Sequence, residues 1–145
     1  MLYQKIMATN DKFRASFKNR IEKSKNKTEL YVKKILVLID NSLTEKSPVD
    51  TGRFKRNWIV GVGGINYATN DEKGAKPFEI AELKNSLEIN SLKINGQVIY
   101  ITNSLPYAHR LEYEAWSSQS TAMVGRTLAE INSMINSTAV SLRKV

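Results

Sequence analysis

The residues that could perform acid–base, nucleophilic or metal chemistry are few and scattered. His109 is the only histidine, and Glu112 and Glu114 do not stand at the spacing of a known metal-ligand motif. Ser104 and Asp50 would complete a catalytic triad with His109, but the serine lacks the sequence context of a nucleophile elbow. We therefore interpret His109 as a structural or interface residue, and we expect Glu112 to form a salt bridge within or between subunits.

The glycine-rich stretch 61–64 follows an apolar segment, where a phosphate-binding loop would begin. It lacks the third glycine of the dinucleotide-binding pattern and the Gly-Lys-Ser/Thr of a phosphate loop, so we interpret it as the end of a strand. The chain has no cysteine, which excludes disulfides and thiolate metal sites. We predict that the protein is not an enzyme, and we expect no cofactor, no metal and no small-molecule substrate.

Positive charge is concentrated near the N-terminus. The formal net charge is +8, and residues 1–34 contain ten lysines and arginines but only three acidic residues. This imbalance favours an acidic partner: nucleic acid, an anionic membrane surface or an acidic protein face. The possible contacts with DNA or an acidic partner are Lys18, Lys23, Lys25 and Lys27.

Two patterns argue against a membrane partner and for assembly in the cytoplasm. The longest apolar run, residues 35–39, is far shorter than a membrane-spanning helix. Residues 1–5 lack the apolar core of a signal peptide.

The basic region has the periodicity of an α-helix. Phe13, Phe17 and Ile21 recur every four residues, and apolar residues between 31 and 43 continue with spacings of three and four. We favour one long helix over residues 1–46, with a polar middle. Two helices with a break near Asn26 are the alternative. Pro48 ends the helix, because the residue before a proline avoids the α conformation.

The remaining residues alternate between strand and helix signals. We predict strands over 54–62 and 98–102, a loop over 66–77, a short helix over 78–83, a turn at 95–96, an irregular segment after the second strand, and a helix over 123–142. The apolar stripe of the last helix comprises Val124, Leu128, Ile131, Ile135 and Leu142.

These elements predict an α+β fold: a long N-terminal helix, a small antiparallel sheet, and a C-terminal helix packed on it. We expect a single domain over 1–145, divided into a basic helix (1–46), strands with a variable loop (47–113) and a closing helix (122–143). So small a sheet leaves open edges, which favour pairing with a neighbouring copy.

Two segments resemble one family of virion proteins. Residues 47–58 read Ser-Pro-Val-Asp-Thr-Gly-Arg-Phe-Lys-Arg-Asn-Trp, and residues 99–113 contain a strand, Asn, Pro-Tyr-Ala and Glu-Tyr. Together they resemble the neck or tail-completion proteins of long-tailed bacteriophages, which include proteins similar to minor tail protein Z. The order of a long helix, the first block, a variable middle, the second block and a terminal helix also agrees with that family.

The resemblance implies a non-enzymatic structural protein located in the virion, at the neck or upper tail. Family members are expected to form rings, with six-fold symmetry, that enable head–tail joining. Their expected partners are further copies and tail-tube, tail-terminator or head-closure proteins. A tail-terminator subunit that caps the tail tube is the alternative, and a DNA-binding module that uses the basic helix is an alternative of another class.

The residues of the two blocks have simple structural interpretations. Asp50, Thr51 and Gly52 suit a tight turn, beside which Arg53 can pair with Asp50 or Glu112. Trp58 is expected in the core, Asn103 in an Asx-turn, and Pro106 fixes the local backbone. Four residues either build the fold or face a neighbouring subunit, and the sequence leaves both open: Tyr107, Arg110, Glu112 and Tyr113.

Overall fold

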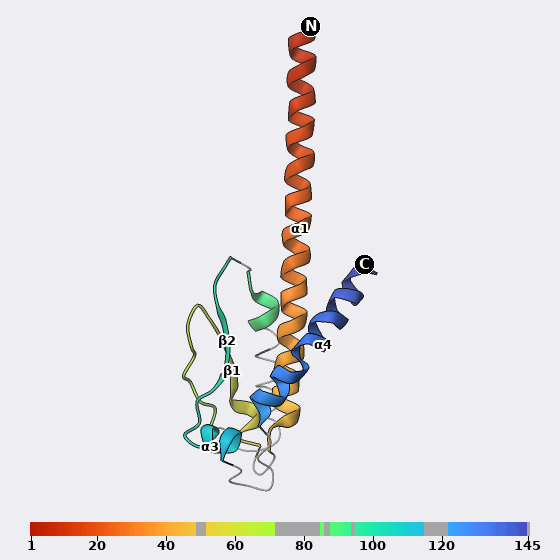
Figure 1. Ribbon diagram of the computed structural model, residues 1–145. Helices are drawn as coiled ribbons and strands as arrows, with labels where there is room; N and C mark the ends of the chain where they lie inside the picture. The colour runs from red at the N-terminus through yellow and green to blue at the C-terminus, as the bar shows by residue number, and fades with distance from the viewer. Residues whose placement is uncertain (49–51, 72–84, 86–87, 94, 115–121, 145) are drawn as a thin grey trace.

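The computed structural model describes residues 1–48, 52–71, 85, 88–93, 95–114 and 122–144. Its α+β architecture agrees with the fold predicted from the sequence, with a long first helix, a small antiparallel sheet of two strands and a C-terminal helix; this last helix packs on the first helix (Figure 1). The elements, in order, are α1 (Leu2–Lys46), the 3-10 helix η1 (Lys55–Asn57), β1 (Trp58–Val62), β2 (Ile99–Asn103), α3 (Ala108–Tyr113) and α4 (Met123–Arg143).

The α1 helix is continuous, so the alternative with a break near Asn26 is wrong. Ser47 follows its last turn with an extended backbone, and its N–H donates to the carbonyl of Thr44. This ending agrees with the effect expected of Pro48, which disfavours the α conformation at the preceding residue.

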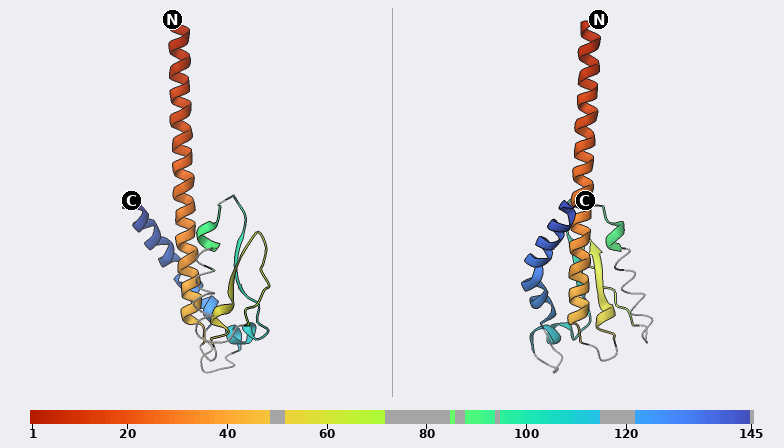
Figure 2. Two further views of the ribbon diagram at one scale, coloured as in Figure 1. Left: turned by 180° about the vertical axis from the view of Figure 1, so that it is seen from behind. Right: turned by 90° about the vertical axis from the view of Figure 1, so that its right-hand side faces the viewer.

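The first half of α1 projects away from the rest of the molecule. Every residue from 1 to 28 is exposed, and no other element lies beside this part of the helix in either view (Figures 1 and 2). At a rise of about 1.5 Å per residue the projection is about 40 Å long. The protein therefore consists of a packed body and a projecting helix, which we define as residues 2–28.

The lower half of α1 packs against α4. The hydroxyls of Ser42 and Thr127 share a buried hydrogen bond of 2.9 Å, and the Tyr31 hydroxyl donates to the carbonyl of Ile135 at 3.4 Å. Lys46 adds an ion pair with Glu130 at 2.8 Å. The two helices are thus joined by polar contacts along a shared face.

The face that α4 buries is displaced from the predicted stripe. Val124 and Leu128 were expected to be buried but are 37% and 58% exposed, whereas Met123, Thr127 and Thr138 are buried. The small Thr127 side chain lets α1 approach closely, and its hydroxyl is satisfied by Ser42. The face of α4 that contacts α1 therefore includes Met123, Thr127 and Thr138. Apolar periodicity alone had indicated the neighbouring face, which includes Val124 and Leu128.

The sheet consists of β1 and β2, whose register pairs Trp58 with Asn103 and Val62 with Ile99. The strand predicted over 54–62 begins only at Trp58, because residues 55–57 form η1. The Asn57 side chain stabilises this turn by donating to the carbonyl of Arg53 at 2.7 Å. The second strand lies one residue later than predicted, at Ile99–Asn103.

Two further segments bear on the sequence predictions. The segment predicted to be irregular after the second strand contains the short helix α3, at Ala108–Tyr113. The short helix predicted over 78–83 lies outside the described residues, although residues 88–91 are helical.

The main core cluster brings together residues from α1, α3 and α4, from the segment around η1 and the start of β1, and from the segment after β2. Its buried members are Leu43, Phe54, Trp58, Leu105, Leu111 and Met123.

The ion pair between α1 and α4 makes stability depend on pH. The hydrogen bond from Lys46 is the main cause that lowers the pKa of Glu130 below its ordinary value. A carboxyl group with a lowered folded-state pKa stabilises the protein above its unfolded pKa, and this contribution is lost as the pH falls through the folded value. Wild type should therefore be more stable than Glu130→Gln at pH 7, and the two should converge below about pH 4. Urea unfolding at several pH values measures the difference, and a gap independent of pH would contradict the prediction.

Trp58 should contribute to stability through its hydrogen bond as well as its volume. Its indole N–H donates to the Ser47 hydroxyl at 2.7 Å in a buried setting. Trp58→Phe and Ser47→Ala should each lower the free energy of unfolding by about 1–3 kcal/mol, because Ser47→Ala leaves the buried indole N–H without an acceptor and Trp58→Phe removes the donor to Ser47 together with part of the ring volume. The double variant should lose less than the sum of the two, as measured by a denaturant double-mutant cycle, whereas additive losses would show that the bond contributes nothing.

Candidate assembly surfaces

The two sequence blocks that carry the family resemblance pack against each other. The Asn103 side chain donates to the carbonyl of Phe54 at 2.9 Å, and it accepts the N–H of Leu105 at 3.3 Å. The second bond is the Asx-type turn predicted for Asn103. The Phe54 ring also contacts the Tyr107 ring, with centroids 6.0 Å apart. Residues 47–58 and 99–113 therefore act as one structural unit.

Trp58 occupies the core, as predicted, and connects that unit to α1. Its ring meets Phe54 edge-on at a centroid distance of 5.7 Å, and its indole N–H donates to Ser47. Ser47 in turn donates to the carbonyl of Leu43 at 2.6 Å. The block that begins at Ser47 is thus tied directly to the end of α1.

The turn that was predicted at the start of the first block is described only in part. Asp50 and Thr51 lie outside the described residues, while Gly52 has a φ of +73°, a conformation that favours glycine. Arg53 donates to the Asp71 carboxylate through Nε at 3.0 Å and through a terminal nitrogen. This hydrogen bond is the main cause that raises the pKa of Arg53.

Glu112 does not pair with Arg53, which was one of the two pairings considered for that arginine. Its carboxylate instead accepts the backbone N–H groups of Val124 and Gly125, each at 3.0 Å. These groups lie in the first turn of α4, where amides lack partners within the helix and a negative charge is favourable. Ala122, which precedes α4, makes no side-chain cap, so Glu112 supplies the cap from α3.

Of the four residues that the sequence left open between fold and interface, two contact the body and two are exposed. Tyr107 and Glu112 hold the body together through the contacts described above. Tyr113 is 71% exposed, and its ring lies 4.7 Å from that of the exposed His109. Arg110 is also exposed and pairs with Glu114 at 3.8 Å. Together with the exposed Pro106, these side chains form an accessible surface on α3.

Sequence reasoning missed two buried polar residues in the first block, Arg56 and Asn57. The Asn57 side chain donates to the carbonyl of Asn70 at 2.9 Å and accepts its N–H at 2.6 Å, which secures the segment after β1. Arg56 is 3% exposed, and its Nε donates to the same carbonyl at 3.4 Å. Both side chains follow charged or polar neighbours in the sequence, and no apolar pattern signals their burial.

The four candidate lysines do not form a single face. Lys18 and Lys25 are seven residues apart and share one side of α1, and Lys23 and Lys27 are four apart and share another. All four are exposed. The charge therefore surrounds the projecting helix instead of forming one strip that a nucleic-acid backbone could follow.

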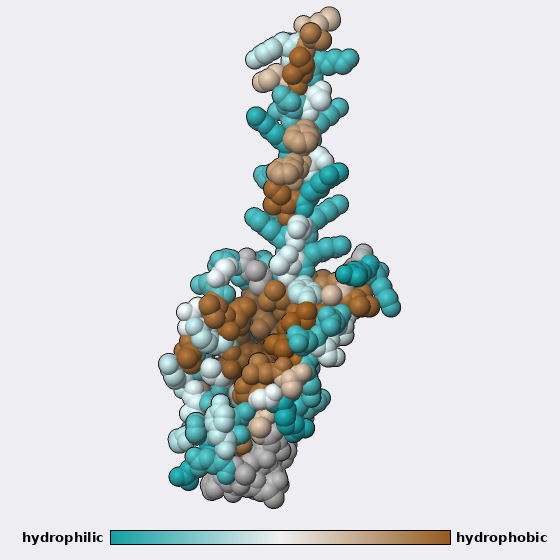
Figure 3. Space-filling view, viewed as in Figure 1, coloured by the Kyte–Doolittle hydropathy of each residue, from teal (hydrophilic) through white to brown (hydrophobic). Residues whose placement is uncertain are grey.

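The projecting helix also exposes an apolar stripe, which we define as Leu2, Ile6, Phe13, Phe17 and Ile21, and which Thr9 and Asn10 interrupt between Ile6 and Phe13. Phe13 and Phe17 are 68% and 57% exposed, and their rings stack with centroids 6.2 Å apart. Figure 3 shows apolar side chains along this helix, with hydrophilic ones on both sides. The sequence predicted that Phe13, Phe17 and Ile21 share a helix face, and all three are exposed, with no other described element packed against them.

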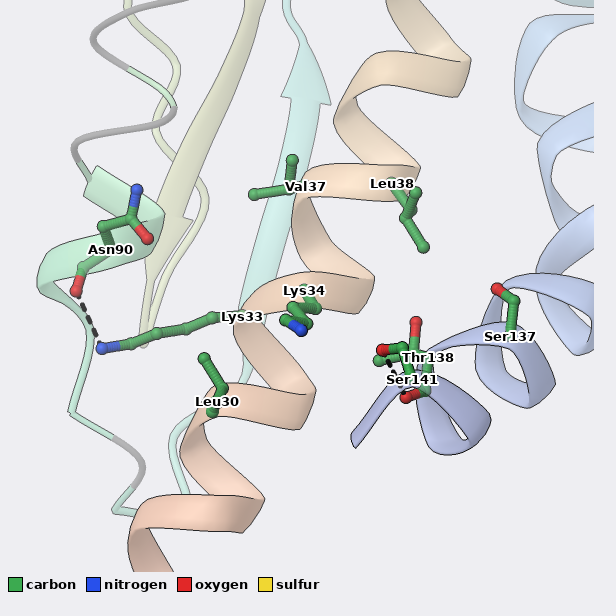
Figure 4. A pocket seen from close by; sticks show the side chains of 9 residues that line it. All are labelled: Leu30, Lys33, Lys34, Val37, Leu38, Asn90, Ser137, Thr138 and Ser141. Atoms are coloured by element: carbon green, nitrogen blue, oxygen red, sulfur yellow. Dashed lines mark hydrogen bonds between the residues drawn. The ribbon is translucent and has the colours of Figure 1, made fainter. Parts of the chain in front are cut away.

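An apolar groove lies where the body meets the projecting helix. It has a volume of about 580 Å³ and is lined by Leu30, Val37 and Leu38 of α1, by Asn90, and by Ser137, Thr138 and Ser141 of α4. Lys33 and Lys34 also line it, and the Lys33 ammonium donates to the carbonyl of Asn90 at 2.8 Å (Figure 4). The groove is thus an apolar floor with basic side chains beside it.

The contact between Glu112 and α4 can be tested by removing its carboxylate. Glu112→Ala should lower the free energy of unfolding by about 1–2 kcal/mol, because two amide groups lose their acceptor. Glu112→Gln should lose less, since the amide oxygen still accepts one bond. Glu114→Ala, on the exposed side of the same segment, is the matched control and should change stability little. Equal effects of Glu112→Ala and Glu114→Ala in urea unfolding would refute the capping role.

Two structural features are absent from the described residues. No group of three histidine, aspartate or glutamate side chains within them is close enough to hold a metal ion. No described helix combines the length and apolar character needed to cross a membrane. Comparisons with family models, curated proteins and solved structures found no match to this chain.

Proposed function

We propose that this chain is a structural subunit of a tailed-bacteriophage virion that assembles into a ring at the head–tail junction. The observation that carries the proposal is the projecting helix, whose apolar stripe is exposed to water along its length. Monomeric soluble proteins rarely expose contiguous apolar surface unless it binds a partner. A protein built to assemble accounts for this stripe, whereas an isolated enzyme does not.

Two further features support the proposal. The blocks that resemble the neck or tail-completion family form the unit that joins the end of α1 to the sheet and to α4. In the described part of the chain the sheet has only two strands, which leaves edges for pairing with a neighbouring copy. A tail-terminator ring would use the same features, so it remains the alternative within this class.

A phage whose genome encodes this chain provides the test. Disrupting the gene should yield filled heads and tails that remain separate in electron micrographs, and wild-type protein supplied in trans should restore joined, infectious particles. The variant Phe13→Ser/Phe17→Ser should fold, because both rings are exposed, yet restore joining poorly. Lys12→Glu, on another side of the helix, is the control. Normal joining without the gene would refute the proposal.

DNA binding by α1 is a second candidate function, favoured by the exposed lysines. It predicts duplex binding that weakens steeply as the salt concentration rises. It leaves the apolar stripe uncovered, however, and for this reason we rank it below assembly.

A further inference from the structure

We infer that the apolar stripe of the projecting helix docks an acidic amphipathic helix of a partner protein. This inference rests on the proposed function, in that it names the chemistry of one partner of the assembling subunit. It follows from two observations: the continuity of the stripe with an existing helix interface, and the charges beside it.

The stripe continues the face of α1 that already packs against a helix. From Ile21 the same side of α1 passes through Ser24 and Thr28, in steps of three or four residues, to Tyr31 and onward to Ser42. Tyr31 and Ser42 contact α4 through hydrogen bonds to Ile135 and Thr127. The α4 helix ends at Arg143, so it covers this face of α1 within the body and leaves the same face exposed along the projecting helix. A second helix beside the projection would extend an interface geometry that the protein already uses.

The charges beside the stripe select an acidic occupant. Arg14 and Arg20 each lie three residues from Phe17, one before it and one after, so they flank the stripe on both sides. Both are exposed, and neither has an ion-pair partner among the described residues. The acidic Asp11 and Glu22 lie outside the stripe. Glutamates flanking the apolar face of a partner helix would pair with both arginines.

The same charges disfavour a second copy as the occupant. If two projecting helices paired through their stripes, Arg14 and Arg20 of one copy would face basic residues of the other, and like charges at such positions repel. Binding of nucleic acid through the lysines would leave the phenylalanines in water. An acidic protein helix covers the stripe and neutralises its flanks at once.

The groove beside Leu30 and Leu38 is a separate surface, because Leu30 is nine residues, or about two and a half helical turns, from Ile21 and so lies on the opposite side of α1. The face shown in Figure 3 includes both the apolar side chains of the projection and the apolar hollow of the body. Lys34 lines the groove, so its charge has the same sign as the flanks of the stripe. The inference therefore concerns the stripe and the residues that flank it, and the groove is not part of the docking surface.

The test uses the full-length protein and two synthetic helical peptides of about four heptads, long enough to form a helix on binding. Both carry leucine and isoleucine on one face; one has glutamate on both flanks and the other lysine. The protein should bind the glutamate peptide, with affinity that falls as ionic strength rises, and should bind the lysine peptide at least about tenfold more weakly. Fluorescence anisotropy of labelled peptides measures both.

Variants locate the site. Arg14→Glu/Arg20→Glu should weaken binding of the glutamate peptide by about tenfold or more, and Phe13→Ser/Phe17→Ser should abolish it. Lys12→Glu changes charge at a position whose neighbours on the helix are Ala8, Thr9, Ala15 and Ser16, and should have little effect. Far-ultraviolet circular dichroism confirms that each variant retains its helices.

Four results would overturn the inference: equal binding of the two peptides, self-association of the protein that Phe13→Ser/Phe17→Ser removes, binding only to phosphatidylserine vesicles, or binding only to duplex DNA. Each would assign the stripe to another occupant. These outcomes are separate from the test of head–tail joining, because loss of joining in the gene disruption would stand even if the acidic peptide did not bind.

Discussion

The hydrogen bond between the Trp58 indole and the Ser47 hydroxyl joins the end of α1 to the start of the sheet, and the rest of the body is arranged around that junction. The opposite side of Trp58 is tethered as well, because its carbonyl accepts from Asn85, whose side chain also donates to the buried Asp40 of α1. A large ring held by its N–H and its backbone has little freedom to shift. Because β1 begins at Trp58, its position sets the register with β2.

From this junction the chain is secured step by step by side chains that bond to backbone groups. Asn103 ties the end of β2 to Phe54, and Glu112 ties α3 to the first turn of α4. The α4 helix then returns to α1 through the hydroxyls of Ser42 and Thr127. The contacts that hold the body together therefore both start and finish at α1. Polar groups at these crossings have defined partners, which makes the arrangement more specific than apolar contact alone would.

The projecting helix is the opposite case, because no tertiary contact supports it within the described chain. Helices in proteins owe their stability mainly to the packing of an amphipathic face, and in the projecting helix that face is unpacked. The residues whose spacing predicts the helix, Phe13, Phe17 and Ile21, are left in water beside Arg14 and Arg20. Both the proposed assembly role and the inferred acidic partner follow from this difference: the body buries its own apolar core, whereas the projecting helix leaves its apolar stripe exposed.

The sequence by itself determined the features that depend on neighbouring residues. Periodicity predicted α1 and α4, Pro48 predicted the end of α1, and β-branched and aromatic residues predicted β2. Within the candidate site, the Asx-turn at Asn103 and the burial of Trp58 were also predicted, because both depend on local chemistry or on a large apolar ring.

Only the tertiary structure decided which residues meet across long separations. It showed that Glu112 caps a helix through amides twelve and thirteen positions away, that Val124 and Leu128 remain exposed, and that no described residue covers Phe13 and Phe17. A helical pattern states that residues share a face, but it does not state what lies opposite. That depends on how distant segments approach, which local spacing does not contain.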